Sequence, residues 1–124
     1  MFRMLFSGPG LRALWMAATA DRKAFPFGEF QAGLDARGNA TARRIFLESI
    51  RHLDALYAPI EAELERIDVP VTLVWADRDP FFPVAVGQRT ASRFRSARWI
   101  LVQGGHFLPQ ERPQAVAAAI LQDS

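Results

Sequence analysis

The chain has 124 residues, of which 50% are hydrophobic and none is cysteine. It therefore carries enough apolar material for the core of one domain, and it excludes a disulfide scaffold and any thiolate metal site. Lys and Arg number 15 and Asp and Glu number 13, which leaves a net charge of +2 spread along the sequence. A nucleic-acid-binding surface needs concentrated positive charge, so this class of function is disfavoured.

The sequence also predicts no membrane segment, because no apolar run approaches the roughly 20 residues that span a bilayer. Residues 1–6 have some character of a signal peptide, but Gly8, Pro9 and Gly10 interrupt them before an apolar region of about 7–15 residues forms. We therefore expect a cytoplasmic protein, which agrees with the lack of cysteine.

The first part of the chain has the pattern of short helices. After the interruption at residues 8–10, residues 11–20 place apolar side chains at helical spacing. Residues 21–38 are expected to be irregular, with no more than a turn of helix at 29–34, because glycine and proline punctuate them.

A longer apolar stripe follows, with apolar residues recurring every three or four positions between 45 and 64. Asn39 has the type of side chain that caps a helix N-terminus. Pro59 lies within the stripe, and a proline removes a backbone donor and clashes with the preceding turn. We therefore predict a break near Ala58 and a shorter second helix that ends at Glu65.

The composition changes near residue 67, where β-branched runs begin. Residues 69–75 form a continuous apolar run, typical of a strand that is covered on both faces. We expect a loop at 77–83, a helix at 84–94, a second strand at 98–102 and a final helix at 113–121. The order strand–helix–strand–helix requires a parallel pair of strands joined by a right-handed crossover.

Two parallel strands do not bury both of their faces alone, because parallel sheets occur with several strands and with helices on both sides. The second part of the chain therefore has the pattern of the last section of a larger sheet. We assign the chain to the α/β class and divide it into a helical segment, 1–66, and an α/β section, 67–124.

One reactive side chain follows each predicted strand, Asp79 after the first and His106 after the second. The carboxyl ends of neighbouring parallel strands open into the same crevice, so we expect these two side chains to meet. A carboxylate beside an imidazole forms the acid and the base of a nucleophilic triad. Asp77, in the same loop as Asp79, is interpreted as a turn former.

The segments IDVPVTLVWADRDPFFP at 67–83 and GGHFLPQERPQAV at 104–116 resemble the carboxy-terminal section of an α/β-hydrolase. The resemblance is to the lid-bearing group that includes haloalkane dehalogenases, epoxide hydrolases and carboxylesterases. It implies that Asp79 is the triad acid and His106 the base, and that residues 1–66 are the end of a helical lid. Ala76 stands where that family usually has glycine.

The same resemblance implies hydrolysis of a small apolar ester, epoxide or halide, with no metal and no organic cofactor. The family places its nucleophile on a sharp turn before the lid. Ser7, Ser49, Ser92 and Ser96 all lack that context, and no aspartate has it. We therefore expect the chain to be inactive alone, and either self-association or a complementing amino-terminal section is compatible with the missing nucleophile.

Aromatic residues are the candidates for substrate contacts. Phe81 and Phe82 follow the acid and are expected at the rim of a pocket, and the resemblance to a lid adds Trp15 and Phe27, for which a place in the core is an equal alternative. Residues 110–113 are interpreted only as the start of the last helix. A rival hypothesis is a non-catalytic module that self-associates, or binds a partner, through an open sheet edge.

Overall fold

The computed structural model describes residues 8–35, 41, 44–45, 48–49 and 51–122. The described helices and strands are, in chain order, α2 (Gly8–Ala18), α3 (Phe27–Asp35), α5 (Leu53–Glu63), the 3₁₀ helix η1 (Leu64–Arg66), β1 (Val71–Ala76), α6 (Val84–Ala91), β2 (Ala97–Val102), α7 (Leu108–Glu111) and α8 (Pro113–Leu121). The expected helix cap at Asn39 lies outside the described residues. Within the described parts, no helix combines the length and apolarity needed to cross a bilayer.

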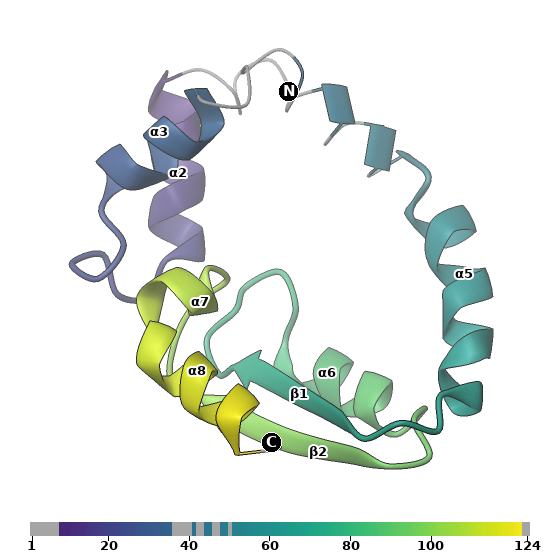
Figure 1. Ribbon diagram of the computed structural model, residues 1–124. Coiled ribbons are helices and arrows are strands. Elements are labelled where there is room, and N and C mark those ends of the chain that lie inside the picture. The colour runs from purple at the N-terminus through teal and green to yellow at the C-terminus, as the bar shows by residue number, and fades with distance from the viewer. Residues whose placement is uncertain (1–7, 36–40, 42–43, 46–47, 50, 123–124) are drawn as a thin grey trace.

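The two strands pair in parallel, as the sequence predicts, in a register that runs from Val71 opposite Ala97 to Ala76 opposite Val102. Figure 1 shows α6 crossing between β1 and β2, with α7 and α8 following β2. Both strands therefore end at the same edge of the sheet, and the loops that follow them begin side by side. The predicted α/β arrangement is confirmed.

One face of the sheet presents two tryptophans to α6. The indole rings of Trp75 and Trp99 stack with centroids 5.7 Å apart. Gly87 of α6 lies directly over them, since a Cβ atom built there would come within 2.5 Å of both rings. Side chains alternate along a strand, and the neighbouring Val74 lines a pocket together with Val116 of α8. Helices α6 and α8 therefore pack closely against the two strands.

Several expected boundaries were wrong in the first part of the chain. The first helix, expected at 11–20, begins at Gly8 and ends at Ala18, so residues 8–10 are part of it. Proline is tolerated in the first turn of a helix, where its missing N–H has no intrahelical acceptor, and this explains the position of Pro9. Helix Phe27–Asp35 is longer than the single turn expected within 21–38.

The predicted break near Ala58 is also wrong. Pro59 lies inside α5, and the chain instead turns at His52, directly before this helix. A proline within a helix removes one hydrogen bond to the preceding turn. The side chains of residues 55–60 are exposed, so water can hydrate the carbonyl group that loses its partner.

In the second part, β1 begins at Val71, because Pro70 lacks a backbone donor and restricts Val69, which is 63% exposed. We had expected this strand to be covered on both faces, but the first five residues of β1 are only half-buried. Helix α6 ends at Ala91 and not at residue 94. A two-stranded sheet leaves most of its strand residues partly in contact with solvent, and in β1 only Ala76 is buried.

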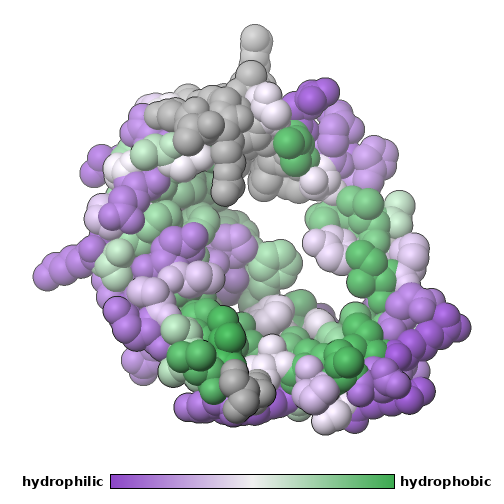
Figure 2. Space-filling view, viewed as in Figure 1, coloured by the Kyte–Doolittle hydropathy of each residue, from purple (hydrophilic) through white to green (hydrophobic). Residues whose placement is uncertain are grey.

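Buried apolar side chains are few and fall into two groups. Leu11, Trp15, Ala18 and Phe25 are buried around α2, and Ala76, Leu108 and Ala119 are buried beside the sheet. Figure 2 shows that the chain surrounds an open centre with apolar side chains at its border. The apolar residues of α5 are largely exposed: Leu53, Leu56, Tyr57 and Ile60. Much of the predicted apolar stripe thus has no cover within the described residues.

The contact between Gly87 and the two tryptophans predicts a local cost of overpacking. Gly87→Ala is expected to lower the free energy of unfolding by about 1–3 kcal/mol, because the added methyl group would overlap both indole rings. Gly28→Ala is the matched control, because a Cβ atom there meets nothing within 4 Å, and it is expected to be neutral or stabilising by up to about 1 kcal/mol. Chemical denaturation followed by tryptophan fluorescence measures both. Equal stability of the two variants would contradict the packing described.

Candidate active site

Asp79 is held in the loop that follows β1. One carboxylate oxygen, Oδ1, accepts backbone N–H bonds from Phe81 at 2.8 Å and from Phe82 at 3.1 Å. Only 10% of the side chain is exposed. These two bonds fix the plane of the carboxylate and leave Oδ2 directed away from its own loop.

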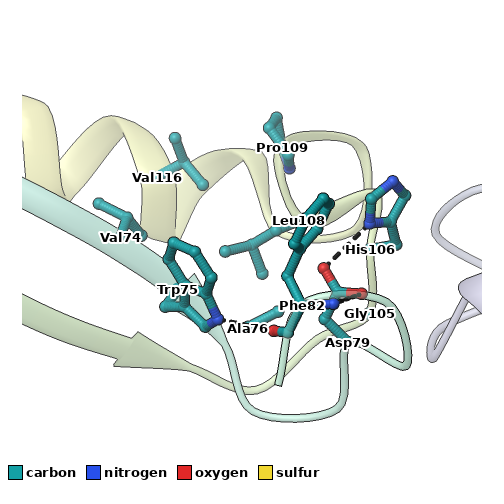
Figure 3. A pocket seen from close by; sticks show the side chains of 10 residues that line it. All are labelled: Val74, Trp75, Ala76, Asp79, Phe82, Gly105, His106, Leu108, Pro109 and Val116. Atoms are coloured by element: carbon teal, nitrogen blue, oxygen red, sulfur yellow. Dashed lines mark hydrogen bonds and ion pairs between the residues drawn. The ribbon is translucent and has the colours of Figure 1, made fainter. Parts of the chain in front are cut away.

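His106 lies in the turn that follows β2 and faces that free oxygen. Its ring atom Nδ1 is 2.9 Å from Oδ2 of Asp79 (Figure 3). An ionised carboxylate only accepts hydrogen bonds, so the proton of the neutral imidazole is placed on Nδ1. The second ring nitrogen, Nε2, then has a lone pair that can accept a proton. The side chain of His106 is 31% exposed to solvent. This is the geometry of an orienting acid and a base.

Backbone bonds between the two loops bring these side chains together. The N–H of Asp77 donates to the carbonyl of Val102 at 3.0 Å, and that of Arg78 donates to Gly104 at 3.1 Å. The Asp77 carboxylate accepts the N–H of Gly104 at 3.0 Å. Asp77 therefore ties one loop to the other instead of forming a local turn, and it is Asp79 whose carboxylate accepts the N–H groups two and three residues further on.

Aromatic rings surround the imidazole of His106. The ring centroids of Phe81, Phe82 and Phe107 lie 5.0 Å, 5.7 Å and 5.3 Å from it. A cavity of about 260 Å³ beside the imidazole is lined by Asp79, His106 and Phe82 and by apolar residues of β1, α7 and α8 (Figure 3). The imidazole of His106 thus borders a mostly apolar cavity.

The four aromatic candidates occupy different places. Phe82 lines the cavity, and Phe81 is 47% exposed beside His106. Trp15 is buried, and its indole N–H donates to the carbonyl of Phe25 at 3.0 Å. Phe27 packs edge-on against Trp15, 5.6 Å between centroids, and neither residue lines this cavity. The assignment of substrate contacts to these residues stays a prediction.

No described residue takes the place of a nucleophile. In the described parts of the chain, no serine hydroxyl is hydrogen-bonded to His106; that of Ser92, for instance, donates to the carbonyl of Arg89. Ser7 lies outside the described residues. The same described parts hold no cluster of carboxylates and imidazoles that would bind a metal ion.

Sequence reasoning missed the most buried charged residue of the site. Glu111 is 2% exposed, and its carboxylate accepts N–H bonds from Ala20, Asp21 and Gly105. The interpretation of residues 110–113 as merely the start of the last helix is therefore wrong, because α7 ends at Glu111 before α8 begins. Local sequence carries little signal for this role, since two of the three donors lie about 90 residues earlier.

An ion pair lies next to this buried carboxylate. Nη1 of Arg112 donates to Oδ2 of Asp21 at 2.7 Å, and Oδ1 of Asp21 accepts the N–H groups of Lys23 and Ala24. The hydrogen bond from Arg112, together with these backbone bonds, lowers the pKa of Asp21 below its ordinary value of 3.8. Both side chains are about one-third exposed, so solvent weakens the pair.

Comparison with known proteins supports this fold. Residues 2–119 match the alpha/beta hydrolase family, and the chain belongs to that family. Over 72 residues, or 57% of the chain, it is 32% identical to the uncharacterized hydrolase YugF of Bacillus subtilis (strain 168), of which it covers 26%. The chain therefore spans about a quarter of the length of this curated relative.

A solved structure shares the fold. The structure titled as Est816, an N-acyl homoserine lactone degrading enzyme, superimposes on 99% of the chain with a TM-score of 0.69 at 20% sequence identity. The chain covers 51% of that structure. The match supports the interpretation of the two-stranded sheet and its helices as part of an α/β-hydrolase fold.

The lowered pKa of Asp21 gives a prediction at acid pH. Its ionised form stabilises the fold above the ordinary value of 3.8, and this contribution is lost as the pH falls through the lower folded value. In Arg112→Gln the main cause is removed, so the titration midpoint of Asp21 should rise toward 3.8. Carboxyl ¹³C NMR measures the midpoint. Arg66→Gln, which removes an exposed arginine bonded to Glu63, is the control and should leave Asp21 unchanged; a midpoint that is the same in all three proteins would contradict this assignment.

Proposed function

We propose that this chain supplies the acid and the base of a hydrolytic site, with Asp79 as the acid and His106 as the base. The observation that carries the proposal is the 2.9 Å contact between Nδ1 of His106 and Oδ2 of Asp79 at the carboxyl ends of two neighbouring parallel strands. Membership of the alpha/beta hydrolase family supports it.

In the proposed mechanism, Nε2 of His106 takes a proton from the attacking water, and before that from the nucleophile where the nucleophile is a hydroxyl, and each time the imidazolium gives this proton to the leaving group. Asp79 keeps the proton of the neutral ring on Nδ1 and stabilises the imidazolium that forms. Both oxygens of Asp79 are already bonded, one to backbone N–H groups and one to His106, so its orientation costs no further reorganisation during the reaction.

The surroundings of the base favour a small apolar substrate. The cavity beside His106 is lined mainly by apolar side chains, among them Phe82, and the ring of Phe81 also contacts the imidazole. An ester, an epoxide or a halide fits this chemistry, because each is attacked at carbon and needs a base for the hydrolytic step. We propose that helices α2, α3 and α5 are part of a lid over such a pocket. In this proposal Trp15 and Phe27 contact the substrate from the lid.

The nucleophile and the oxyanion donors are proposed to come from a complementing amino-terminal section of the same fold. The chain covers about half of the solved hydrolase structure that it superimposes on, so that fold has a further half to supply them. Without it, the chain is expected to show no hydrolytic turnover, since loss of the triad nucleophile removes most of about 10⁶-fold acceleration.

The substitution Asp79→Asn tests the acid–base pair. The N–H groups of Phe81 and Phe82 would retain the amide oxygen, so the NH₂ group of the new side chain would face His106 and donate to Nδ1. The neutral ring should then carry its proton on Nε2, the wrong nitrogen for a base. Ring ¹⁵N NMR of the parent chain is expected to show a protonated Nδ1, and that of the variant a protonated Nε2. In an enzyme that contains this section with its nucleophile, the same change should lower kcat by about 10⁴.

His52 is the internal control for this experiment. It lies on the exposed side of the helical segment with Glu48 as its charged neighbour, 3.8 Å away, and makes no contact with Asp79. Its ring nitrogens should be the same in both proteins. If those of His106 are also the same in both, Asp79 does not orient the imidazole and the proposed function fails.

A second candidate function, a binding module, is favoured by the exposed sheet. In the described part of the chain the sheet has two strands, so each strand has an edge without a strand neighbour. We propose that the partner is the complementing section of the same fold, which would add a strand parallel to β1. The pocket lies along β1, and the half-fold coverage of the solved structure supports a partner of this kind.

In the absence of that partner, the chain is expected to self-associate. Parallel strands with open edges and exposed apolar residues such as Leu101, Ile120 and Leu121 favour association between copies. Sedimentation velocity over a range of concentrations should show species larger than a monomer that grow with concentration. A cooperative, folded monomer at the highest concentration would contradict the module and show that the open edge is protected.

A further inference from the structure

Glu111 joins two segments that are distant in sequence. Its Oε2 atom accepts the N–H of Ala20 at 3.0 Å and that of Asp21 at 2.7 Å, and each of its oxygens lies 3.2 Å from the N–H of Gly105. Gly105 directly precedes His106 in the chain. The buried carboxylate therefore links the turn that carries the base to the segment that follows α2.

We propose that Glu111 is a positioning residue for His106. The carboxylate holds Gly105 against residues 18–21, and this places the next residue so that its own N–H donates to the carbonyl of Ala18 at 2.8 Å. With the backbone of His106 fixed at this point, its ring meets Asp79. The inference rests on the proposed function, because it assigns Glu111 a role through the base.

The chemistry of the contact requires a carboxylate. Burial of an ionised group is costly unless hydrogen bonds replace its hydration, and Glu111 has three backbone donors for this purpose. Glutamine has one acceptor oxygen, so its NH₂ group would have to face at least one backbone donor. Glu111→Gln would then leave an N–H group opposite an N–H group at the turn that carries His106.

The segment allows little space for adjustment. A Cβ atom at Gly105 would come within 2.7 Å of both the Ala20 nitrogen and Oε1 of Glu111. Residues 18–21 and the turn before His106 are thus in direct backbone contact, with Glu111 between them. On the outer side, the ion pair between Arg112 and Asp21 adds a second link to the same segment.

This arrangement couples the first part of the chain to the proposed base. Residues 18–21 continue directly from α2, whose end supplies the Ala18 carbonyl. A displacement of α2 therefore reaches the backbone of His106 through one hydrogen bond and through Glu111. A purely local packing role for Glu111 would not make the hydrogen bond of His106 to Asp79 depend on it.

The experiment measures the Nδ1–H proton of His106 in the parent chain, in Glu111→Gln and in Glu63→Gln. Glu63 is an exposed carboxylate bonded to Arg66, so the control removes the same charge at a distant place. Hydrogen bonds to charged groups are worth enough that their loss should speed exchange of the Nδ1–H proton with water about 10-fold or more in Glu111→Gln. The control should leave it unchanged.

The backbone amides of Phe81 and Phe82 separate a positioning effect from general loss of stability. Both donate to Asp79 and lie in the other loop. Their exchange rates should remain within about two-fold of the parent in Glu111→Gln, whereas a merely structural role would speed all three protons together. Faster exchange of all three, or of none, would overturn the proposal.

If Glu111→Gln does not fold, as judged by circular dichroism, Arg112→Gln decides. It removes the bonds of the guanidinium to Asp21 and to the main-chain carbonyl of Glu111, and it leaves the buried carboxylate in place. Faster exchange of the His106 Nδ1–H proton with unchanged Phe81 and Phe82 amides supports the proposal, and an unchanged Nδ1–H proton overturns it. A shift of the ring in Asp79→Asn without an effect of the Glu111 or Arg112 variants would leave the proposed function standing and remove only this inference.

Discussion

The parallel register of β1 and β2 is the constraint on which the site depends. Because Ala76 and Val102 are paired at the end of the two strands, the loops that follow start next to each other. Their first residues continue the pairing through the bonds of Asp77 and Arg78 to the second loop. Asp79 and His106 are 27 residues apart in the sequence. The backbone hydrogen bonds between their loops bring the carboxylate and the imidazole within reach of each other.

The same two-stranded arrangement leaves only a small buried interior in the described parts of the chain. The described parts of the chain contain seven well-buried apolar residues. Three of them lie beside the sheet and four lie around α2. The hydrophobic term scales with the apolar area removed from water, and α5 contributes little to it because its apolar side chains remain exposed. The half-buried β1 agrees with our proposal that a complementing section of the same fold covers it.

Much of this could be predicted from sequence where the determinants are local. The apolar runs of β1 and β2, the final helix and the positions of Asp79 and His106 after their strands all follow from patterns within about ten residues. Pro59 was misjudged because an exposed helix can hydrate the carbonyl that a proline leaves unpaired. Glu111 was missed because its burial depends on backbone donors about 90 residues away, which no local pattern records. The nucleophile could not be predicted, because no segment of the sequence has its context.

The large separation between Glu111 and its donors has a consequence for the order of folding. Bringing Asp79 to His106 closes a loop of 27 residues, whereas bringing Ala20 to Glu111 closes one of 91 residues. Loop-closure entropy costs about 0.6 kcal/mol for each doubling of length, so the longer closure is less favourable by about 1 kcal/mol. The crossover unit that contains Asp79 and His106 is therefore expected to form before α2 joins it. Early in folding, the chain would hold the pair of Asp79 and His106 while the turn that carries the imidazole is still unattached to the amino-terminal helices.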